Sequence, residues 1–303
     1  MDRQVIECVP NFSEGRDAAV VTRIVEAIAG VPDVAVLGQT SDRDHNRSVI
    51  TFAGAPGPVA EAAFRGIECA AELIDLNRHA GVHPRVGAAD VVPLVPVAGV
   101  TLEFCALLAE QLGERVWREL HIPVYLYEAA ARRADRANLA NVRRGRYEKL
   151  RDEVRQNPDR LPDFGEAALH PTAGACVIGA RKFLIAFNVN LESGDVEIAR
   201  TIAKRIRFSS GGLPAVRALG LYLESRHQAQ VSINLIDFEQ TPLCTVVEAV
   251  RAEARRCGAH IAGMELIGLI PRKAIEDRGD CDLQFDNFTP DLILENRLAQ
   301  LLR

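Results

Sequence analysis

The chain carries one order of strand-like and helix-like segments twice, and this repetition limits the possible folds more than any other feature. In each half a strand is followed by a helix, two strands, a second helix and a last strand, which is the split β-α-β-β-α-β pattern. Runs of β-branched residues indicate the strands, and longer amphipathic segments indicate the helices. The strands are expected at residues 4–9, 34–40, 47–54, 91–97, 182–191, 215–225, 230–237 and 261–270. The helices are expected at residues 17–29, 58–72, 194–206 and 242–256.

Further elements are expected around this repeat: a helix capped by Thr101, a strand at 122–129, and helices near 143–156 and 290–303. A chain of 303 residues is longer than one hydrophobic core usually supports. We therefore predict an α/β fold of the α+β type with two related lobes, each a mixed β-sheet with helices on one face. The boundary is expected near 175–180, which gives an N-terminal lobe of residues 1–178 and a C-terminal lobe of residues 179–303.

Charge gives no reason to expect a nucleic-acid partner. The formal net charge is −5, and no basic run is interleaved with aromatic residues. The most basic stretch holds Arg132, Arg133, Arg136, Arg143, Arg144 and Arg146. Acidic residues among these arginines favour a solvated helical face, and attraction of an anionic ligand is the alternative.

The N-terminus, MDRQVIECVPNF, lacks the apolar core of a signal peptide, and no apolar run reaches membrane-spanning length. The seven cysteines are scattered singly without a C-x-x-C pair, which disfavours a disulfide framework or a cysteine zinc site. We expect a cytoplasmic protein with no membrane partner.

Residues 73–96 hold the strongest candidate for a reaction centre, LIDLNRHAGVHPRVGAADVVPLVP. His79 and His83 are four residues apart, but Gly81 and Pro84 exclude a helix, so both histidines are expected on a loop. His83 titrates near neutrality and can take up and return a proton, which makes it the catalytic candidate. A zinc site shared with His79 is the alternative, although no third ligand is evident.

Two more polar segments are candidate binding sites. Residues 42–47 (DRDHNR) lie between two expected strands and indicate either a hairpin turn or a site in which Arg47 binds a carboxylate. Residues 165–174 (GEAALHPTAG) indicate either a linker or a ligand-binding segment whose small residues let backbone amides approach a flat molecule. No G-x-G-x-x-G or Walker motif is present, so a nucleotide is disfavoured.

A series of motifs runs in order through nearly the whole chain: ECVPNFSEGR, DHNRSVITFAG, LIDLNRHAGVHPRVGAADVVPLVPV, IPVYLYEAA, PDFG, GARKFLIAFNVNL, RALGLYL, AQVSINLIDFE and ELIGLIPRKA. With these motifs the sequence resembles the formiminotransferase family, in its stand-alone bacterial form without a cyclodeaminase domain. The resemblance implies an enzyme that transfers the formimino group of N-formimino-L-glutamate to N5 of tetrahydrofolate. It also implies two α/β lobes, a homodimer, and tetrahydrofolate as co-substrate with no metal.

The resemblance assigns the catalytic role to the histidine of the H-P-R motif, which is His83. Arg47 and Arg85 are candidates for binding the glutamate carboxylates, because a guanidinium matches a carboxylate in shape and charge. The folate-binding segment that follows the P-D-F-G motif maps to Gly165, Glu166, Ala167, Ala168, Leu169, His170, Pro171, Thr172, Ala173 and Gly174.

The sequence departs from the family pattern in two places. Gly38, Gln39 and Thr40 stand where relatives carry aspartates, which puts an acid function there in doubt. Glu166 replaces a common proline and leaves a carboxylate near the folate segment. Two other functions stay open: transfer of a formyl group from N-formylglutamate, and folate binding without turnover.

Overall fold

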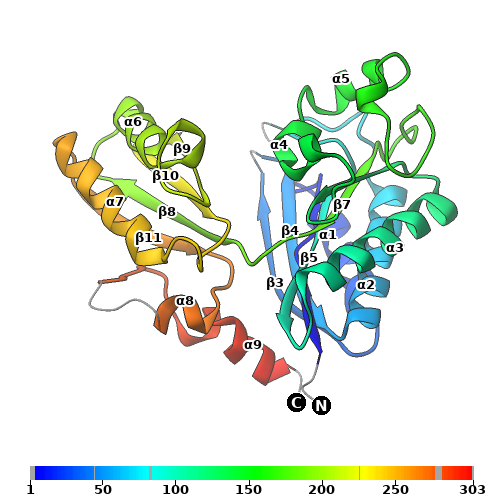
Figure 1. Cartoon of the computed structure of the whole chain (residues 1–303), viewed down its shortest axis with the longest axis horizontal. Helices are drawn as coiled ribbons and strands as arrows, with labels where there is room; N and C mark the ends of the chain where they lie inside the picture. Colours follow the sequence, from blue (N-terminus) through cyan, green and yellow to red (C-terminus); the bar gives the residue numbers. More distant parts are fainter. Residues whose placement is uncertain (1–3, 44, 82–83, 225, 277–281, 302–303) are drawn as a thin grey trace. The chain divides into compact units, whose positions relative to one another are not determined.

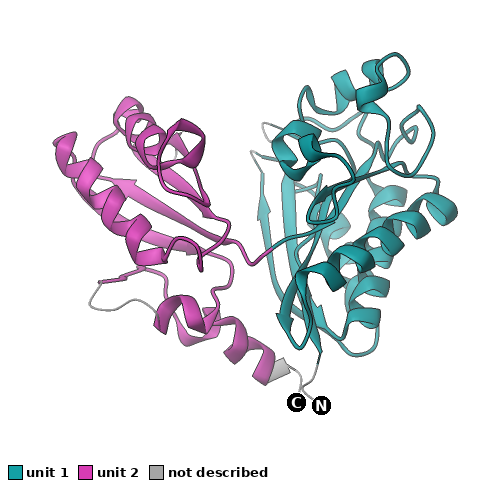
Figure 2. Cartoon of the chain, in the orientation of Figure 1, with its two compact units in different colours: residues 1–181, 302 teal, residues 182–301, 303 magenta. Residues whose placement is uncertain are grey.

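The computed structural model describes residues 4–43, 45–81, 84–224, 226–276 and 282–301. The chain divides after Arg181 into two compact units, called unit 1 and unit 2 (Figure 2). The sequence analysis places the boundary after residue 178. His83 and its neighbour at position 82 lie outside the described residues. No helix in the described ranges is long and apolar enough to cross a membrane.

Unit 1 is built on one mixed sheet. Its strands are β1 (Val5–Cys8), β2 (Asn11–Phe12), β3 (Val34–Asp42), β4 (Arg47–Gly54), β5 (Ala89–Ala98), β6 (Val124–Glu128) and β7 (Cys176–Ala180). β1 and β2 follow one another between β4 and β5, so the order across the sheet is β3, β4, β1 with β2, β5, β7, β6. The pairings from β3 to β5 are antiparallel, whereas β7 runs parallel to both β5 and β6.

The longer helices of unit 1 cover one face of this sheet. They are α1 (Ala18–Ala29), α2 (Pro56–Leu73) and α3 (Leu102–Leu120) (Figure 1). Their apolar faces form the main core with strand residues such as Ile6, Phe52 and Leu94. The predicted Thr101 cap is confirmed, because its side chain accepts the Phe104 N–H at the start of α3. At the start of α1, Asp17 accepts the N–H groups of Ala19 and Val20.

Two short helices, α4 (Leu139–Val142) and α5 (Arg146–Glu153), lie against the opposite face. Val142 and Leu150 pack with Tyr125 and Tyr127 of β6, whereas the intervening Leu126 belongs to the main core. Neighbouring residues of a strand point to opposite faces, so helices occupy both faces of this sheet. The prediction of helices on one face therefore holds for the longer helices only.

Strand β7 was not predicted. Its residues, CVIGA, are all buried and are inserted between β5 and β6. A strand buried on both faces has no alternation of polar and apolar residues, so it shows no period-2 pattern. The sequence analysis places the domain boundary in this stretch.

Unit 2 contains β8 (Ile185–Leu191), β9 (Val216–Leu223), β10 (Gln228–Leu235) and β11 (Ile261–Ile267) in the order β11, β8, β10, β9. All of these pairings are antiparallel, so the prediction of a mixed sheet is wrong for this unit. The reason is that β10 lies between β8 and β9. Those two strands run in the same direction, and β10 runs against both.

Helices α6 (Val196–Ile206) and α7 (Leu243–Arg256) pack on one face of the unit 2 sheet. The residues of β8 alternate accordingly: Ile185, Phe187 and Val189 are in the core, and Ala186 and Asn188 are partly exposed. The chain ends with α8 (Arg272–Glu276), a 3₁₀ turn (Pro290–Leu292) and α9 (Leu294–Leu301). The last α-helix thus begins at Leu294 rather than at residue 290.

Both units share one plan. The order β1-α1-β3-β4-α2-β5 in unit 1 repeats as β8-α6-β9-β10-α7-β11 in unit 2. In each unit the first strand lies between the third and the fourth, and the second strand pairs only with the third. The predicted α/β class and the two related lobes are confirmed, and α3 to β7 are additions that unit 1 alone carries.

Candidate functional site

The described residues between α2 and β5 form no helix, as predicted. Helix α2 ends at Leu73, a turn follows at 76–78, and strand β5 begins at Ala89. His79 and Arg85 lie at the two ends of the segment that contains His83. Because His83 is outside the described residues, its predicted catalytic role is neither supported nor opposed by geometry.

The side chains of His79 and Arg85 are joined directly. Nε of Arg85 donates to Nδ1 of His79 at 2.8 Å, and Nη2 donates to the His79 carbonyl oxygen at 3.1 Å. On its other side, Nε2 of His79 lies 2.8 Å from the carbonyl oxygen of Asn46. Since Nδ1 accepts, Nε2 must carry the proton and donate to that carbonyl. The imidazole is therefore neutral and uses both ring nitrogens.

Burial lowers the pKa of His79, the hydrogen bond to Asn46 opposes this shift, and the charge of Arg85 adds to it. A neutral ring with no free lone pair cannot bind a metal ion. Among the residues that the structure describes, no group of three or more His, Cys, Asp or Glu side chains could hold a metal. The zinc site shared with His79 is therefore not supported.

A carboxylate from α5 completes this arrangement. Glu148 accepts from Nη2 of Arg85 at 2.9 Å and from Nη1 at 3.4 Å. Arg85 is 5% exposed, whereas more than half of the Glu148 side chain is exposed. Burial acts to raise the pKa of Glu148, but the hydrogen bonds from Arg85 act against burial, and the pKa is lowered. Sequence analysis missed Glu148 because it lies 63 residues from Arg85 in a segment that indicates only a charged helix.

His79 and Arg85 border a small concavity of about 10 Å³. It is lined by Phe12, Ser13, His45, Asn46, Arg47, His79, Arg85 and Asp90. The residues come from the end of β2, the β3–β4 turn, the histidine loop and the start of β5. This is about the space that one water molecule needs, and it is far smaller than the space a drug-sized ligand occupies. We call this concavity the arginine pocket.

The segment at 42–47 is both a hairpin turn and a wall of the arginine pocket. It joins β3 to β4, with Asn46 in the left-handed region at a φ of 49°. Asn46 holds two neighbouring loops. Its Oδ1 accepts the backbone N–H of Gly15 at 3.0 Å, and its Nδ2 donates to the carbonyl oxygen of Ala80 at 3.1 Å. The hairpin-turn alternative is therefore confirmed, and carboxylate binding by Arg47 stays a prediction.

Arg47 borders the arginine pocket with unused hydrogen-bond donors. One Nη group donates to Oδ1 of Asn11, while the enclosed Nε has no partner among the described residues. No described carboxylate lies within ion-pair distance of its guanidinium. Burial, followed by the charge of Arg143, lowers the pKa of Arg47 to about 10. Arg47 is thus a half-buried cation without a direct ion pair among the described residues, and the more distant charges of Asp90 and Asp42 act to raise its pKa.

Two neighbouring arginines have internal counter-ions. Arg85 is paired with Glu148, and Arg143 forms an ion pair with Asp90, which is 2% exposed. The other oxygen of Asp90 accepts the backbone N–H of Val86 at 2.7 Å, so this carboxylate also fixes the end of the histidine loop.

The segment at 165–174 folds into a tight turn that packs against the histidine loop. The backbones of His170 and Gly174 exchange hydrogen bonds of 2.8 and 3.2 Å, and Nδ1 of His170 accepts the Ala173 N–H at 3.0 Å. Burial, followed by the charge of His121, lowers the pKa of His170. Glu166 is exposed on the surface of this segment.

Hydrogen bonds join this turn to both ends of the histidine loop. At one end the carbonyl oxygen of Thr172 accepts the Leu76 N–H at 2.9 Å, and Asn77 Nδ2 donates to the Pro171 carbonyl oxygen at 2.9 Å. At the other end the carbonyl oxygen of Ala173 accepts the Ala88 N–H at 2.8 Å. The structure thus brings two of the sequence-predicted segments together.

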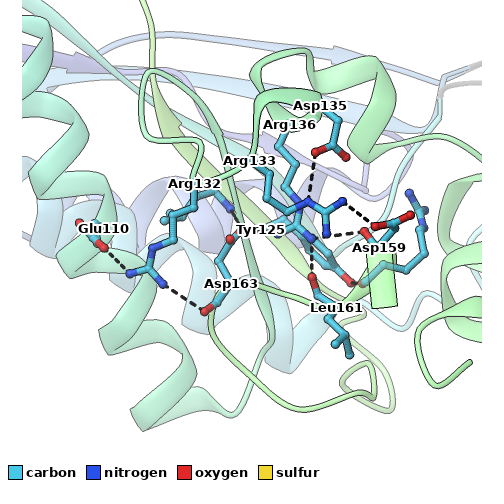
Figure 3. Close-up of polar contacts among 11 residues, drawn as sticks. Glu110, Tyr125, Arg132, Arg133, Asp135, Arg136, Asp159, Leu161 and Asp163 are labelled. Carbon is cyan, nitrogen blue, oxygen red and sulfur yellow. Dashed lines mark hydrogen bonds and ion pairs between the residues drawn. The ribbon is translucent and has the colours of Figure 1, made fainter. Parts of the chain in front are cut away.

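Part of the arginine-rich stretch is buried rather than solvated. Arg136, 4% exposed, donates to Oδ2 of Asp163 at 2.6 Å and to the carbonyl oxygen of Leu161, and it lies over the ring of Tyr125 (Figure 3). Asp163 belongs to the PDFG motif and also accepts the Leu126 N–H at 2.8 Å. The prediction of a solvated helical face is therefore wrong for Arg136. The hydrogen bonds of Arg136 hold the chain in place just before the 165–174 segment.

The altered segment at 38–40 lies on β3. Gly38, Gln39 and Thr40 are exposed, and the register shifts between Val36 and Gly38 in the pairing with β4. β3 is the edge strand of the unit 1 sheet. The structure gives no account of this departure from the family pattern.

The fold and the site together define a class of protein: two α/β units of one plan, the first carrying a buried arginine pocket beside a His-Pro-Arg loop. Residues 5–181 match the model of the N-terminal subdomain of the formiminotransferase domain, and residues 186–295 match the formiminotransferase domain model. The chain belongs to the formiminotransferase family.

Curated relatives agree with this assignment. Glutamate formimidoyltransferase of Streptococcus pyogenes is 45% identical over 97% of this chain and 99% of its own length. The protein of the same name from Thermoplasma acidophilum is 46% identical over 98% of both chains. The mouse formimidoyltransferase-cyclodeaminase is 45% identical over 90% of this chain, which corresponds to 51% of the mouse protein.

Proposed function

We propose that the chain transfers the formimino group of N-formimino-L-glutamate to N5 of tetrahydrofolate, giving 5-formiminotetrahydrofolate and L-glutamate. The observation that carries this proposal is similarity over nearly the whole chain to two glutamate formimidoyltransferases. Unit 1 is then the subdomain with the catalytic loop, and unit 2 is the second subdomain of the transferase. The enzyme works as a cytoplasmic homodimer, and light scattering of the native protein tests the assembly.

In this proposal His83 carries the proton. N5 of tetrahydrofolate attacks the formimino carbon and passes its proton to the imidazole, which leaves a tetrahedral carbon bonded to both nitrogens. The imidazolium returns the proton to the glutamate nitrogen, the bond between carbon and that nitrogen breaks, and glutamate leaves. General acid–base assistance of this kind contributes roughly 10²–10⁴-fold to the rate.

His79 is unsuited to this role, which supports His83 as the carrier. A proton shuttle needs a ring nitrogen that faces the substrate, and both nitrogens of His79 are hydrogen-bonded to protein groups. The lowered pKa also keeps the ring neutral. His79 instead holds its neighbour Arg85.

Folate binding is assigned to residues 165–174. In the second half of this segment the backbone N–H groups of His170, Ala173 and Gly174 are used internally. In the first half, the N–H groups of Glu166, Ala167 and Leu169 have no hydrogen-bond partner among the described residues. Residues 165–169 therefore have backbone donors available for the polar atoms of a flat ligand.

Arg47 is the stronger of the two candidates for binding a glutamate carboxylate. Arg85 already gives its donors to His79 and Glu148, so a substrate would have to displace an internal carboxylate. Arg47 has an unused donor at Nε and no direct ion pair among the described residues, although Asp90 and Asp42 act on its charge from a longer distance. Burying a cation without a counter-ion is costly, and a bound carboxylate would remove that cost.

The deciding experiment measures transfer from formiminoglutamate to tetrahydrofolate, followed as the methenyl product that forms on acidification. N-formylglutamate serves as a parallel donor, and His83→Ala as a parallel enzyme. Turnover with the formimino donor that is lost in His83→Ala is expected. Turnover with the formyl donor alone would change the substrate assignment. Folate binding without turnover of either donor would contradict the proposed reaction.

A further inference from the structure

The first turn of α5 contacts both predicted site segments. The backbone N–H of Tyr147 donates to the carbonyl oxygen of Arg85 at 2.7 Å, and Glu148 accepts two hydrogen bonds from the Arg85 guanidinium. Two consecutive residues of one helix therefore hold the backbone and the side chain of Arg85.

The Tyr147 side chain extends the contact to the 165–174 turn. Its hydroxyl donates to Oδ1 of Asn77 at 3.1 Å, and Nδ2 of Asn77 donates to the Pro171 carbonyl oxygen at 2.9 Å. Tyr147 is 3% exposed and belongs to the main core of unit 1. A rigid, buried ring thus connects the start of the histidine loop with the folate segment.

Glu148 also determines the state of His79. The carboxylate orients the planar guanidinium so that Nε points at Nδ1 of His79. Without that anchor Arg85 can rotate away, and Nδ1 becomes free to accept a proton. Among the described residues, the other charged or titratable groups near this ring are Glu14 and Arg16 from the turn before α1, and His45, Arg47 and Asp90 around the arginine pocket.

We infer that Tyr147 and Glu148 are positioning residues for the proposed transfer. They hold the His-Pro-Arg loop and the 165–174 turn at a fixed relative position, so that the substrate groups bound to these two segments lie at a fixed separation. This inference rests on the proposed function. It also gives α5, part of the arginine-rich stretch that the family motifs do not include, a role in catalysis without contact to substrate.

The first test removes the charge of Glu148. In Glu148→Gln the kcat of formimino transfer is expected to fall about tenfold to a hundredfold, the size of one charge-assisted hydrogen bond, with both KM values changed little. Glu148→Asp should restore part of the loss. Asp152→Asn, an exposed change on the same helix, is the control. A kcat of Glu148→Gln within twofold of this control, or a fall that only matches the loss of folded protein by circular dichroism, would overturn the inference.

The second test removes the Tyr147 hydroxyl. Tyr147→Phe keeps the buried ring but frees Asn77, so the KM for tetrahydrofolate is expected to rise about two- to tenfold, as for one neutral hydrogen bond. Tyr222→Phe in unit 2, whose hydroxyl is exposed near His227, is the matched control. Equal KM values for tetrahydrofolate in the two variants would show that Tyr147 is not a positioning residue.

A readout that needs no turnover separates this inference from the proposed function. Ring ¹⁵N resonances of His79 should show the Nε2–H form in the wild type and a pKa below about 6.5, the ordinary value for histidine. In Glu148→Gln this pKa should move up toward the ordinary value. An unchanged His79 titration would contradict the linkage even in an active enzyme. A shifted titration in a protein that transfers nothing would support the linkage and contradict the reaction.

Discussion

Nδ1 of His79 accepts a hydrogen bond from Nε of Arg85, six residues further along the chain. This contact ties together the two ends of the segment that carries His83. It also fixes the tautomer of His79, because Nδ1 accepts and Nε2 donates to the Asn46 carbonyl oxygen. The contact gives His79 a structural task.

The first prediction concerns the stability of unit 1 below neutral pH. The pKa of His79 is lowered in the fold, so the folded state resists protonation that the unfolded chain accepts from about pH 6.5 downward. The contribution of His79 is therefore fully present above that pH, and it decreases as the pH falls toward the lowered pKa. The difference in unfolding midpoint between pH 7.5 and 5.5 should be smaller in His79→Gln than in the wild type. Parallel curves of unfolding midpoint against pH for the two proteins would contradict this prediction.

The second prediction concerns the buried pair of Asp90 and Arg143. Asp90→Asn leaves the Arg143 charge without its counter-ion, and it also removes one of the two acidic charges that act on Arg47. Loss of one partner of a buried pair costs about 3–5 kcal/mol. Denaturant unfolding should show a loss of this size. The exposed change Asp152→Asn should cost less than about 0.5 kcal/mol.

The third prediction concerns Arg47. Arg47→Lys keeps the charge but loses the planar fork, so the KM for formiminoglutamate should rise about tenfold, with the KM for tetrahydrofolate nearly unchanged. Steady-state kinetics with each substrate varied in turn decides this. Arg78→Lys, on an arginine whose side chain is 90% exposed, is the control. A rise in the tetrahydrofolate KM instead would assign Arg47 to the folate tail.

The fourth prediction concerns Gly174. Its φ is +72°, and a Cβ there would lie 2.4 Å from the Val86 carbonyl oxygen and 2.6 Å from Cδ1 of Leu76. Gly174→Ala should therefore lower the free energy of unfolding by at least about 1–3 kcal/mol through backbone strain alone. Gly57→Ala, at a helical position with no atom within 4 Å, should be neutral or slightly stabilising. Unfolding midpoints of the two variants give the comparison.

Local pattern was sufficient to predict most elements of the fold. The repeated β-α-β-β-α-β order, the Thr101 cap and the absence of a helix among the described residues of the histidine loop all depend on short-range signals. Strand β7 was missed because it is buried on both faces and has no alternation. The antiparallel sheet of unit 2 was missed because strand direction depends on which strand is inserted between two others.

The site was predicted only as far as its residues are close in sequence. Arg47 and Arg85 were chosen for their chemistry, and the structure places both at one pocket. Glu148 and Tyr147 could not be predicted, because their partners Arg85 and Asn77 lie 63 and 70 residues away. Charge composition alone did not reveal which arginines already have internal partners.

The contacts between the histidine loop and the 170–175 stretch have a consequence for synthesis of the chain. The N–H of Ala88 and the carbonyl oxygen of Val86 are paired with Ala173 and Ala175, which the ribosome adds more than eighty residues later. Closing so long a segment has an entropic cost that only the finished unit can offset. The histidine loop is thus made early and fixed late. A nascent chain that stops before Ala173 would contain His79, His83 and Arg85 but would lack the backbone partners of Val86 and Ala88.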